Sequence, residues 1–374
     1  MVRSRLATAS CKGLKLNHQC FKTPPEHSRV VQATLRNSRQ QSGGWRAMTR
    51  VVLHIGMHKT GSTAIQRRLE ANGRMLHQHR ISFDIDSENQ LKPAVKKRDF
   101  RPWQTKLDRA RANNNTLLVS SEVLSHLLTR QPSDSDGCLG DWLIDAFHKQ
   151  GCSVTLIAFL RDQPSYLNSQ YTQHVKKFGL DCRFDSYARQ IMGHTQERGE
   201  CDPQRLFGWI RRNGTTTAHF IPYGGSRALD PFEQLLAVIG AGPATDWMDL
   251  PRINEQPGRL AIETALAVQR RLATKGQAVN DPLHRRQAFR LLQATANLYG
   301  WPKQRFSGLT PELYREIRAH YRASNDAFAQ EVWGAADWAT VFPEESPPPQ
   351  PELRRHQRWL VAWESRRISW MLMR

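Results

Sequence analysis

The sequence predicts an α/β protein built on a three-layer, doubly wound and mainly parallel sheet. Three observations favour this class. Short apolar runs alternate along the chain with segments of helical periodicity, which is typical of strand–helix–strand units. The segment at 153–160 is largely apolar, as expected of a strand that is buried on both faces. The longest uninterrupted apolar runs have five residues, far fewer than the roughly 20 that cross a bilayer.

The elements can be assigned in order along the chain. A strand at 50–55 is followed by a helix that begins at Ser62. The apolar positions on one side of that helix are Ile65, Leu69 and Met75. Further strands are predicted at 116–120, 153–160 and 216–222, and helices at 139–149, 164–176 and 231–239. Beyond residue 257 the pattern is mostly helical, with segments at 257–274, 282–298 and 310–333.

The basic residues are distributed unevenly. The chain of 374 residues has 54 lysines and arginines against 34 acidic residues, a net charge of +20 that points to an anionic partner. Of this excess, +8 lies in residues 1–49 and +10 in residues 50–343. We expect residues 1–47 to be a basic leader, either an organelle transit peptide or a disordered stretch ahead of a true start at Met48. The main domain is then 48–342.

The last part of the chain, 343–374, differs in character. Residues 343–351 form a proline-rich linker, and a basic, tryptophan-rich helix follows it. Such a helix is expected to pack on its own domain or on a dimer mate, or to lie on a membrane surface.

The six cysteines show neither metal-ligand spacing nor a disulfide framework, because no CxxC pair occurs among them. We therefore expect a reducing, cytoplasmic setting. We also expect no obligatory metal, because the loop at 56–63 supplies cationic and N–H groups and no acidic metal-binding pair is evident beside it.

The loop after the first strand has the composition of an anion site. It reads Gly56-Met-His-Lys-Thr-Gly-Ser-Thr63 and opens the first helix. Backbone N–H groups and the positive helix end converge on an anion at such a turn, and Lys59 adds a mobile charge. In a nucleoside-triphosphate loop the lysine follows the last glycine, whereas here Lys59 precedes Gly61. This order disfavours a kinase or ATPase.

The string HIGMHKTGSTAIQ resembles the 5′-phosphosulfate loop of bacterial-type sulfotransferases, which use 3′-phosphoadenosine 5′-phosphosulfate (PAPS). In that family an arginine ends a strand, and a serine eight residues later joins it at the 3′-phosphate; Arg161 and Ser169 match this spacing. The resemblance covers about residues 50–334 and implies a fold of the P-loop/sulfotransferase type. Weaker similarities lie at Asn254-Glu255 and at 321–325.

The resemblance also implies roles for individual residues. Lys59 would act on the bridging and leaving oxygen, and the loop would hold the 5′-phosphate. The loop residues in this set are His58, Lys59, Thr60, Gly61, Ser62 and Thr63. The acceptor needs a base, for which Glu122, just past the strand at 116–120, is the first choice; His126 and His58 are the competitors. Tyr223 and Arg252 are expected near the acceptor cleft and a phosphate.

The sequence thus predicts an enzyme that transfers sulfate from PAPS to a hydroxyl or amine on a carbohydrate or small metabolite, leaving the bisphosphate PAP. A P-loop nucleotide or small-molecule kinase is the alternative. A nucleic-acid-binding protein ranks last, because much of the basic excess lies in the leader.

Overall fold

A computed structural model describes residues 48–373, apart from 87–88, 133–136, 195–200, 213–215, 225–229, 244–245, 251–257, 277–280 and 346–349. The leader assigned to residues 1–47 therefore lies outside the described residues, as do Arg252, Asn254 and Glu255.

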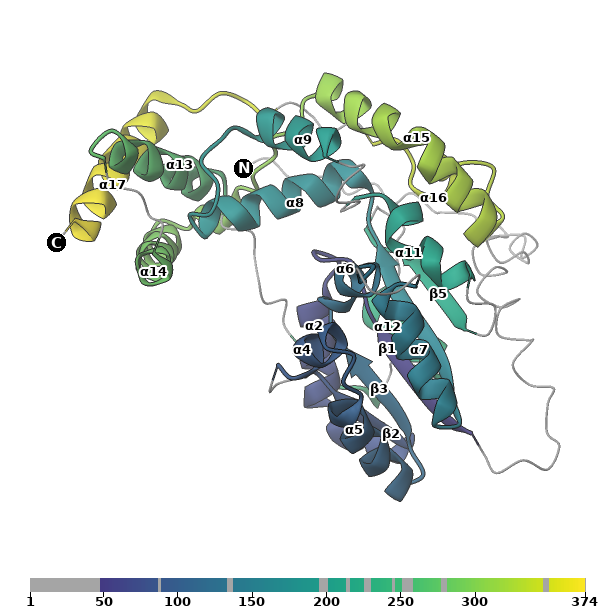
Figure 1. Ribbon diagram of the computed structural model, residues 1–374. Helices are drawn as coiled ribbons and strands as arrows, with labels where there is room; N and C mark the ends of the chain where they lie inside the picture. The colour runs from purple at the N-terminus through teal and green to yellow at the C-terminus, as the bar shows by residue number, and fades with distance from the viewer. Residues whose placement is uncertain are drawn as a thin grey trace, which may run out of the picture. The chain divides into compact units, whose positions relative to one another are not determined.

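Five parallel strands form one sheet in the order β2-β3-β1-β4-β5 (Figure 1). The strands are β1 Thr49–His54, β2 Ile81–Asp84, β3 Thr116–Ser120, β4 Cys152–Leu160 and β5 Thr217–Pro222. In the central register Val51 of β1 lies opposite Leu117 of β3 and Val154 of β4. Because β2 and β3 lie on one side of β1 while β4 and β5 lie on the other, the carboxyl end of β1 sits where ligands bind in open α/β sheets.

Both faces of the sheet are covered by helices, which gives three layers (Figure 1). On one face, Val52 and Ile157 pack with α2 Ser62–Ala71, α3 Gly73–Gln78 and α12 Pro231–Ile239. On the other, Leu53 and Leu156 face helices that include α5 Arg101–Ala112, α7 Leu139–Lys149 and α11 Pro203–Arg212. The short helices α4 Leu91–Lys96 and α6 Leu124–Leu128 join that second layer. Alternate side chains of each central strand are therefore buried on both faces, which explains the continuous apolar runs.

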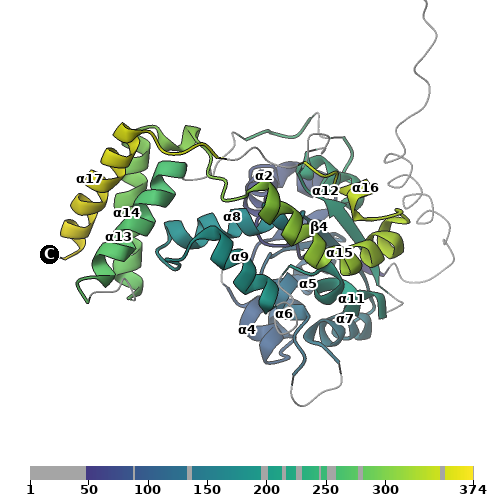
Figure 2. The same ribbon diagram turned by 90° about the horizontal axis from the view of Figure 1, so that it is seen from above.

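Helices predominate beyond β4. They are α8 Gln163–Lys176, α9 Phe184–Gly193, α13 Arg259–Ala273, α14 Pro282–Leu298, the 3-10 turn η2 Trp301–Lys303, α15 Pro311–Trp333, α16 Trp338–Val341 and α17 Arg355–Leu372. The helices α13, α14 and α17 pack on one another, and α13 also packs on α8 (Figure 2). Side-chain oxygens of Asp281 and Thr310 cap the starts of α14 and α15, each followed by proline at the first helical position.

Most predicted elements are confirmed within a residue or two. The α/β class and the parallel sheet are found, and the helix predicted from Ser62 is interrupted at Asn72, so that Met75 belongs to α3. The strand β2 was not among the elements that the sequence predicts. In the described ranges, no helix is both long and apolar enough to span a membrane.

Candidate active site

The loop between β1 and α2 is held in a strained conformation by its neighbours. Lys59 and Gly61 have φ angles of 68° and 82°, in the left-handed region that a lysine rarely adopts. Thr60 Oγ1 donates to the Met57 carbonyl at 2.7 Å, and Arg161 Nη1 donates to the Lys59 carbonyl at 3.0 Å. Alternating left- and right-handed residues turn successive N–H groups toward one point, as in anion-binding nests.

Two buried polar atoms at this loop have no hydrogen-bond partner among the described residues. Ser62 Oγ, at the first residue of α2, is one, and His54 Nε2, at the end of β1, is the other. A methyl group added at Gly56 would lie 3.0 Å from His54 Nε2 and 3.5 Å from Ser62 Oγ. The two atoms therefore share one side of Gly56, where a Cβ atom would be in tight contact with His54. Buried groups of this kind normally have a partner, so the site has capacity for a polar ligand or water.

The orientation of the His54 ring follows from its neighbours, which the sequence reasoning had not singled out. Gln66 Nε2 donates to Ser120 Oγ at 3.2 Å, and Ser120 Oγ lies 2.7 Å from His54 Nδ1. The serine hydroxyl can donate its hydrogen to Nδ1 or accept one from it, because its oxygen has a second lone pair beside the one that faces Gln66. Burial lowers the pKa of His54 to about 4, so the ring is neutral at physiological pH.

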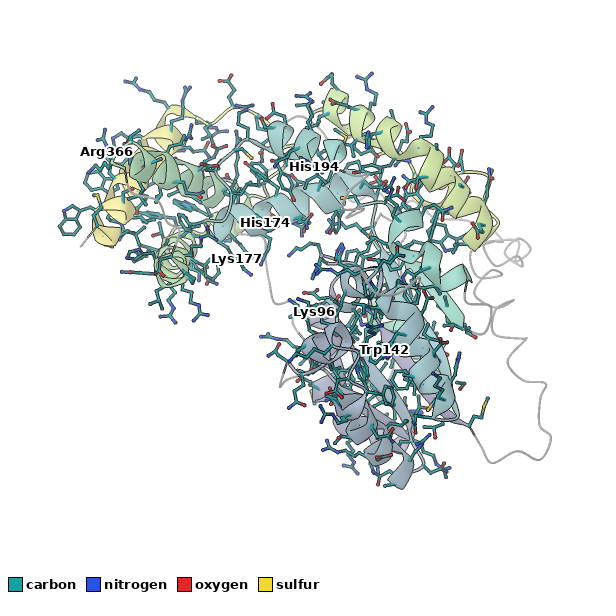
Figure 3. The ribbon with its side chains drawn as sticks, in the orientation of Figure 1. Lys96, Trp142, His174, Lys177, His194 and Arg366 are labelled. Carbon is teal, nitrogen blue, oxygen red and sulfur yellow. The ribbon has the colours of Figure 1, made fainter. Side chains whose placement is uncertain are left out.

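Positive charge gathers beside the loop. Lys59 Nζ lies 3.5 Å from the Gln173 Oε1 of α8. Burial lowers the pKa of Lys59; the charges of Arg161 and Lys177 lower it further, while Glu122 opposes them. Burial, with the charges of Lys59 and Lys177, also lowers the pKa of Lys176 to about 8. Figure 3 labels Lys177 just beyond α8, with His174 one turn before it. A bound anion would relieve this repulsion.

Arg161 lies at the end of β4 and is packed against an aromatic ring. Its guanidinium carbon is 5.8 Å from the ring centre of Tyr223, which follows β5. The same ring covers Gly61, since a methyl group there would lie 3.1 Å from it. Burial lowers the pKa of Arg161. Tyr223, which the sequence analysis placed near the acceptor cleft, therefore packs over the loop itself.

The other predicted cofactor residues differ in position. Ser169 is buried in the second turn of α8, and no hydrogen bond joins it to Arg161 in the described part of the chain. Thr60 is buried with Ser62, whereas Thr63 is exposed to solvent. At 321–325, Asn325 exchanges hydrogen bonds with Gln163 at the start of α8, a structural contact.

All three candidate bases converge at one place. Glu122, which follows β3, has Oε1 3.3 Å from His58 Nδ1. The ring of His126 stacks on that of His58, with centres 5.3 Å apart. The hydrogen bond from His58, aided by the charge of Lys59, lowers the pKa of Glu122, so that its carboxylate is ionised at neutral pH. Burial and the neighbouring His58 lower the pKa of His126 to about 4. Glu122 and Lys59 thus stand close enough to influence each other.

A metal centre is not evident at this site. In the ranges that the structure describes, no group of three or more histidine, cysteine, aspartate or glutamate residues could hold a metal ion. The polar groups at the loop are instead N–H donors, hydroxyls and cations, which suit phosphate or sulfate oxygens.

Comparisons with known proteins found no match: no family model, no curated protein and no solved structure is similar to this chain. The resemblance to sulfotransferases therefore rests on the sequence motifs.

Proposed function

We propose that the protein is a sulfotransferase that moves the sulfuryl group of PAPS to a hydroxyl or amine of a carbohydrate or small metabolite, on a fold of the P-loop type. One observation carries the proposal. Lys59 and Arg161, from the ends of adjacent parallel strands, meet at a strained glycine loop whose buried Ser62 hydroxyl has no partner in the described residues. This is a site prepared for a compact, highly charged anion.

The available groups suit the two ends of the bisphosphate. Backbone N–H groups of residues 59–63 and the hydroxyls of Ser62 and Thr63 would hold the 5′-phosphate. Arg161 and Ser169 would hold the 3′-phosphate, while Lys176 adds charge nearby. In sulfuryl transfer the protein mainly orients the reactants and stabilises charge on the leaving oxygen. Lys59 is suited to that second task because its ammonium lies beside the loop.

Glu122 is suited to remove the proton of the acceptor. As the acceptor oxygen forms a bond to sulfur, the bond from sulfur to the 5′-phosphate oxygen breaks and the acceptor proton passes to the carboxylate. The hydrogen bond from His58 orients Glu122 and keeps it ionised. His126 is the second choice, as a neutral ring held next to His58.

Calorimetry with adenosine 3′,5′-bisphosphate, with ATP and magnesium, and with duplex DNA tests the function. We expect the bisphosphate to bind, and Lys59→Ala and Arg161→Ala each to weaken it roughly 10- to 100-fold, as for lost charge-assisted hydrogen bonds. Arg101→Ala is the matched control, because Arg101 is exposed and pairs with Asp99. Binding of ATP with magnesium in place of the bisphosphate would point to a kinase, and binding of DNA alone to a nucleic-acid-binding protein.

Glu122→Gln separates catalysis from binding. The amide keeps the size of the side chain but cannot accept a proton, so we expect turnover to fall about 10²- to 10⁴-fold while bisphosphate affinity changes little. Release of bisphosphate from PAPS, measured over a panel of glycans, lipids and phenols, provides the readout. Full turnover in this variant would remove Glu122 from the mechanism and favour His126.

A further inference from the structure

The three helices that pack on one another, α13, α14 and α17, carry an unusual charge. They contain ten arginines against two glutamates. The arginines are Arg259, Arg270, Arg271, Arg285, Arg286, Arg290, Arg355, Arg358, Arg366 and Arg367. Of the two acids, Glu364 is buried, paired with Arg367 at 2.6 Å and hydrogen-bonded to Tyr299. Glu263 lies near the buried Tyr171 of α8, where burial raises the pKa of the phenol and the charge of Glu263 raises it further. The outward charge of these helices is therefore strongly positive.

One face of α17 exposes large aromatic side chains. Trp359, Trp363 and Trp370 are 64%, 52% and 49% exposed. Their spacing of four and seven residues puts them in one stripe along the helix, and Arg366, three residues after Trp363 and four before Trp370, falls in the same stripe. The rings of Trp359 and Trp363 stack with centres 5.8 Å apart. The opposite face of α17, with Val361 and Ile368, is buried. All three tryptophans thus keep about half or more of their surface exposed on the other side of the helix.

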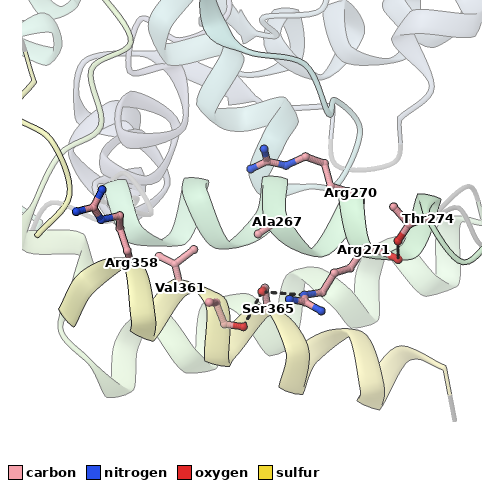
Figure 4. A pocket seen from close by; sticks show the side chains of 8 residues that line it. Ala267, Arg270, Arg271, Thr274, Arg358, Val361 and Ser365 are labelled. Carbon is pink, nitrogen blue, oxygen red and sulfur yellow. Dashed lines mark hydrogen bonds between the residues drawn. The ribbon is translucent and has the colours of Figure 1, made fainter. Parts of the chain in front are cut away.

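Arginines border the tryptophan stripe. Arg270 and Arg271 of α13 and Arg358 of α17 line an open groove between the two helices (Figure 4). Arg271 Nε donates to Ser365 Oγ at 3.3 Å, whereas Arg270 and Arg358 form no ion pair with the described residues. None of the eight residues lining the groove is acidic. Cations without an acidic partner among the described residues thus line a groove along α17, the helix that carries the exposed indole rings.

We propose that the tryptophan stripe of α17 and the bordering arginines bind an anionic membrane surface, with α17 lying in the plane of the interface. Indole rings favour the headgroup region, and arginines there attract anionic lipid. The stripe runs along a helix of 18 residues, about 27 Å long. The exposed side of such a helix can lie along a flat surface. A second copy of this chain is a poorer occupant, because a self-complementary contact would set arginine against arginine. The proposal is independent of the proposed enzymatic function.

Vesicle flotation of the full chain provides the test. We expect binding to vesicles of phosphatidylcholine mixed with phosphatidylserine, little binding to phosphatidylcholine alone, and weaker binding as salt rises. The triple variant Trp359→Ala, Trp363→Ala, Trp370→Ala should lower the partition coefficient at least tenfold. Each change among Arg355→Gln, Arg358→Gln and Arg366→Gln should lower it about fivefold and reduce the salt dependence.

Matched controls lie on the α/β part of the chain. Met248→Ala removes another exposed apolar side chain, and Arg74→Gln removes an exposed arginine of α3; neither should change binding. Thermal unfolding checks that every variant is folded. The proposal is overturned if the folded wild type does not bind anionic vesicles, or if the tryptophan variant binds as well as the wild type. It is also overturned if sedimentation without lipid shows a dimer that the tryptophan variant loses, or if duplex DNA displaces the protein from vesicles.

Discussion

Lys59 has both a strained backbone conformation and a cationic side chain at the candidate site. A left-handed conformation costs a non-glycine residue roughly 1–2 kcal/mol, and here it is held by the hydrogen bond from Arg161 to the Lys59 carbonyl. Two cations are thereby kept near each other. Strain and repulsion concentrated in one loop are typical of functional sites. In the proposed function Arg161 would have two tasks, holding the loop and offering its remaining N–H groups to a ligand.

The lowered pKa of Lys176 predicts how anion binding depends on pH. Its ammonium loses charge as pH rises through about 8, so we expect affinity for the bisphosphate to fall between pH 7 and 9. A bound anion favours the charged form, and binding near pH 8 should therefore take up protons. Calorimetry in two buffers of different ionisation enthalpy measures that uptake. Lys176→Met should abolish it, while Lys92→Met, which removes an exposed lysine of α4, should leave it unchanged.

The contribution of Lys176 to the free energy of unfolding should rise with pH, whereas the affinity for the bisphosphate falls. Since the folded-state pKa of Lys176 lies below its ordinary value of 10.5, the unfolded chain binds more protons between pH 8 and 10.5. The contribution of Lys176 to the free energy of unfolding therefore rises with pH over that window.

In the calorimetric test, proton uptake on bisphosphate binding that persists in Lys176→Met would assign the titration to another group.

Much of the candidate site follows from the sequence. His58 and Glu122 come after β1 and β3, and parallel neighbours bring their carboxyl ends to one edge, so their meeting could be anticipated. The sequence does not determine the buried partners of His54. Ser120 reaches it from a neighbouring strand, and Gln66 of α2 reaches Ser120, with no spacing that distinguishes either from ordinary core residues. Whether the rings of His58 and His126 stack likewise depends on tertiary packing.

At the scale of elements, contact between α7 and α11 depends on Gly140. A Cβ atom at this position would lie 2.4 Å from the ring of Trp209, which is buried and cannot move freely. Gly140→Ala should therefore lower the free energy of unfolding by about 2 kcal/mol, as overpacking exceeds the gain in helix propensity. Gly73→Ala in α3 is the control, since no atom lies within 4 Å, and it should be neutral or stabilising by up to about 1 kcal/mol. Urea unfolding measures both; equal stabilities would contradict the close contact.

The elements that the sequence predicts best carry strong local signals. β4 is apolar over most of its length, and α12 ends at Gly240 in the left-handed conformation that glycine favours. β2 escapes prediction because it has four residues, lies at an edge and is fully buried only at Ile81. The break between α2 and α3 at Asn72 also depends on tertiary structure, because the Asn72 side chain forms hydrogen bonds with the backbone of Met248, a residue distant in sequence.

At the scale of the whole molecule, a buried ion pair joins the site to the C-terminal helices. Asp162, next to Arg161, bonds Arg318 of α15 at 3.2 Å and accepts from the Trp338 indole N–H at 2.9 Å. Arg318 Nη2 donates to the Phe342 carbonyl at 3.0 Å. Burial raises the pKa of Asp162, and the nearby Arg318 opposes that rise. The end of β4 is therefore positioned by residues more than 150 positions later in the chain.

A double-mutant cycle tests this connection. Arg318→Met leaves the Asp162 carboxylate buried without its cation and should cost about 3–5 kcal/mol of unfolding free energy. Asp162→Asn still accepts from Trp338 and should cost less. With both changes no uncompensated charge remains, so the double variant should be more stable than the sum of the single effects predicts. Urea unfolding gives the stabilities, and bisphosphate affinity reports whether Arg161 has moved. Additive losses with unchanged affinity would show that the pair neither couples nor positions the site.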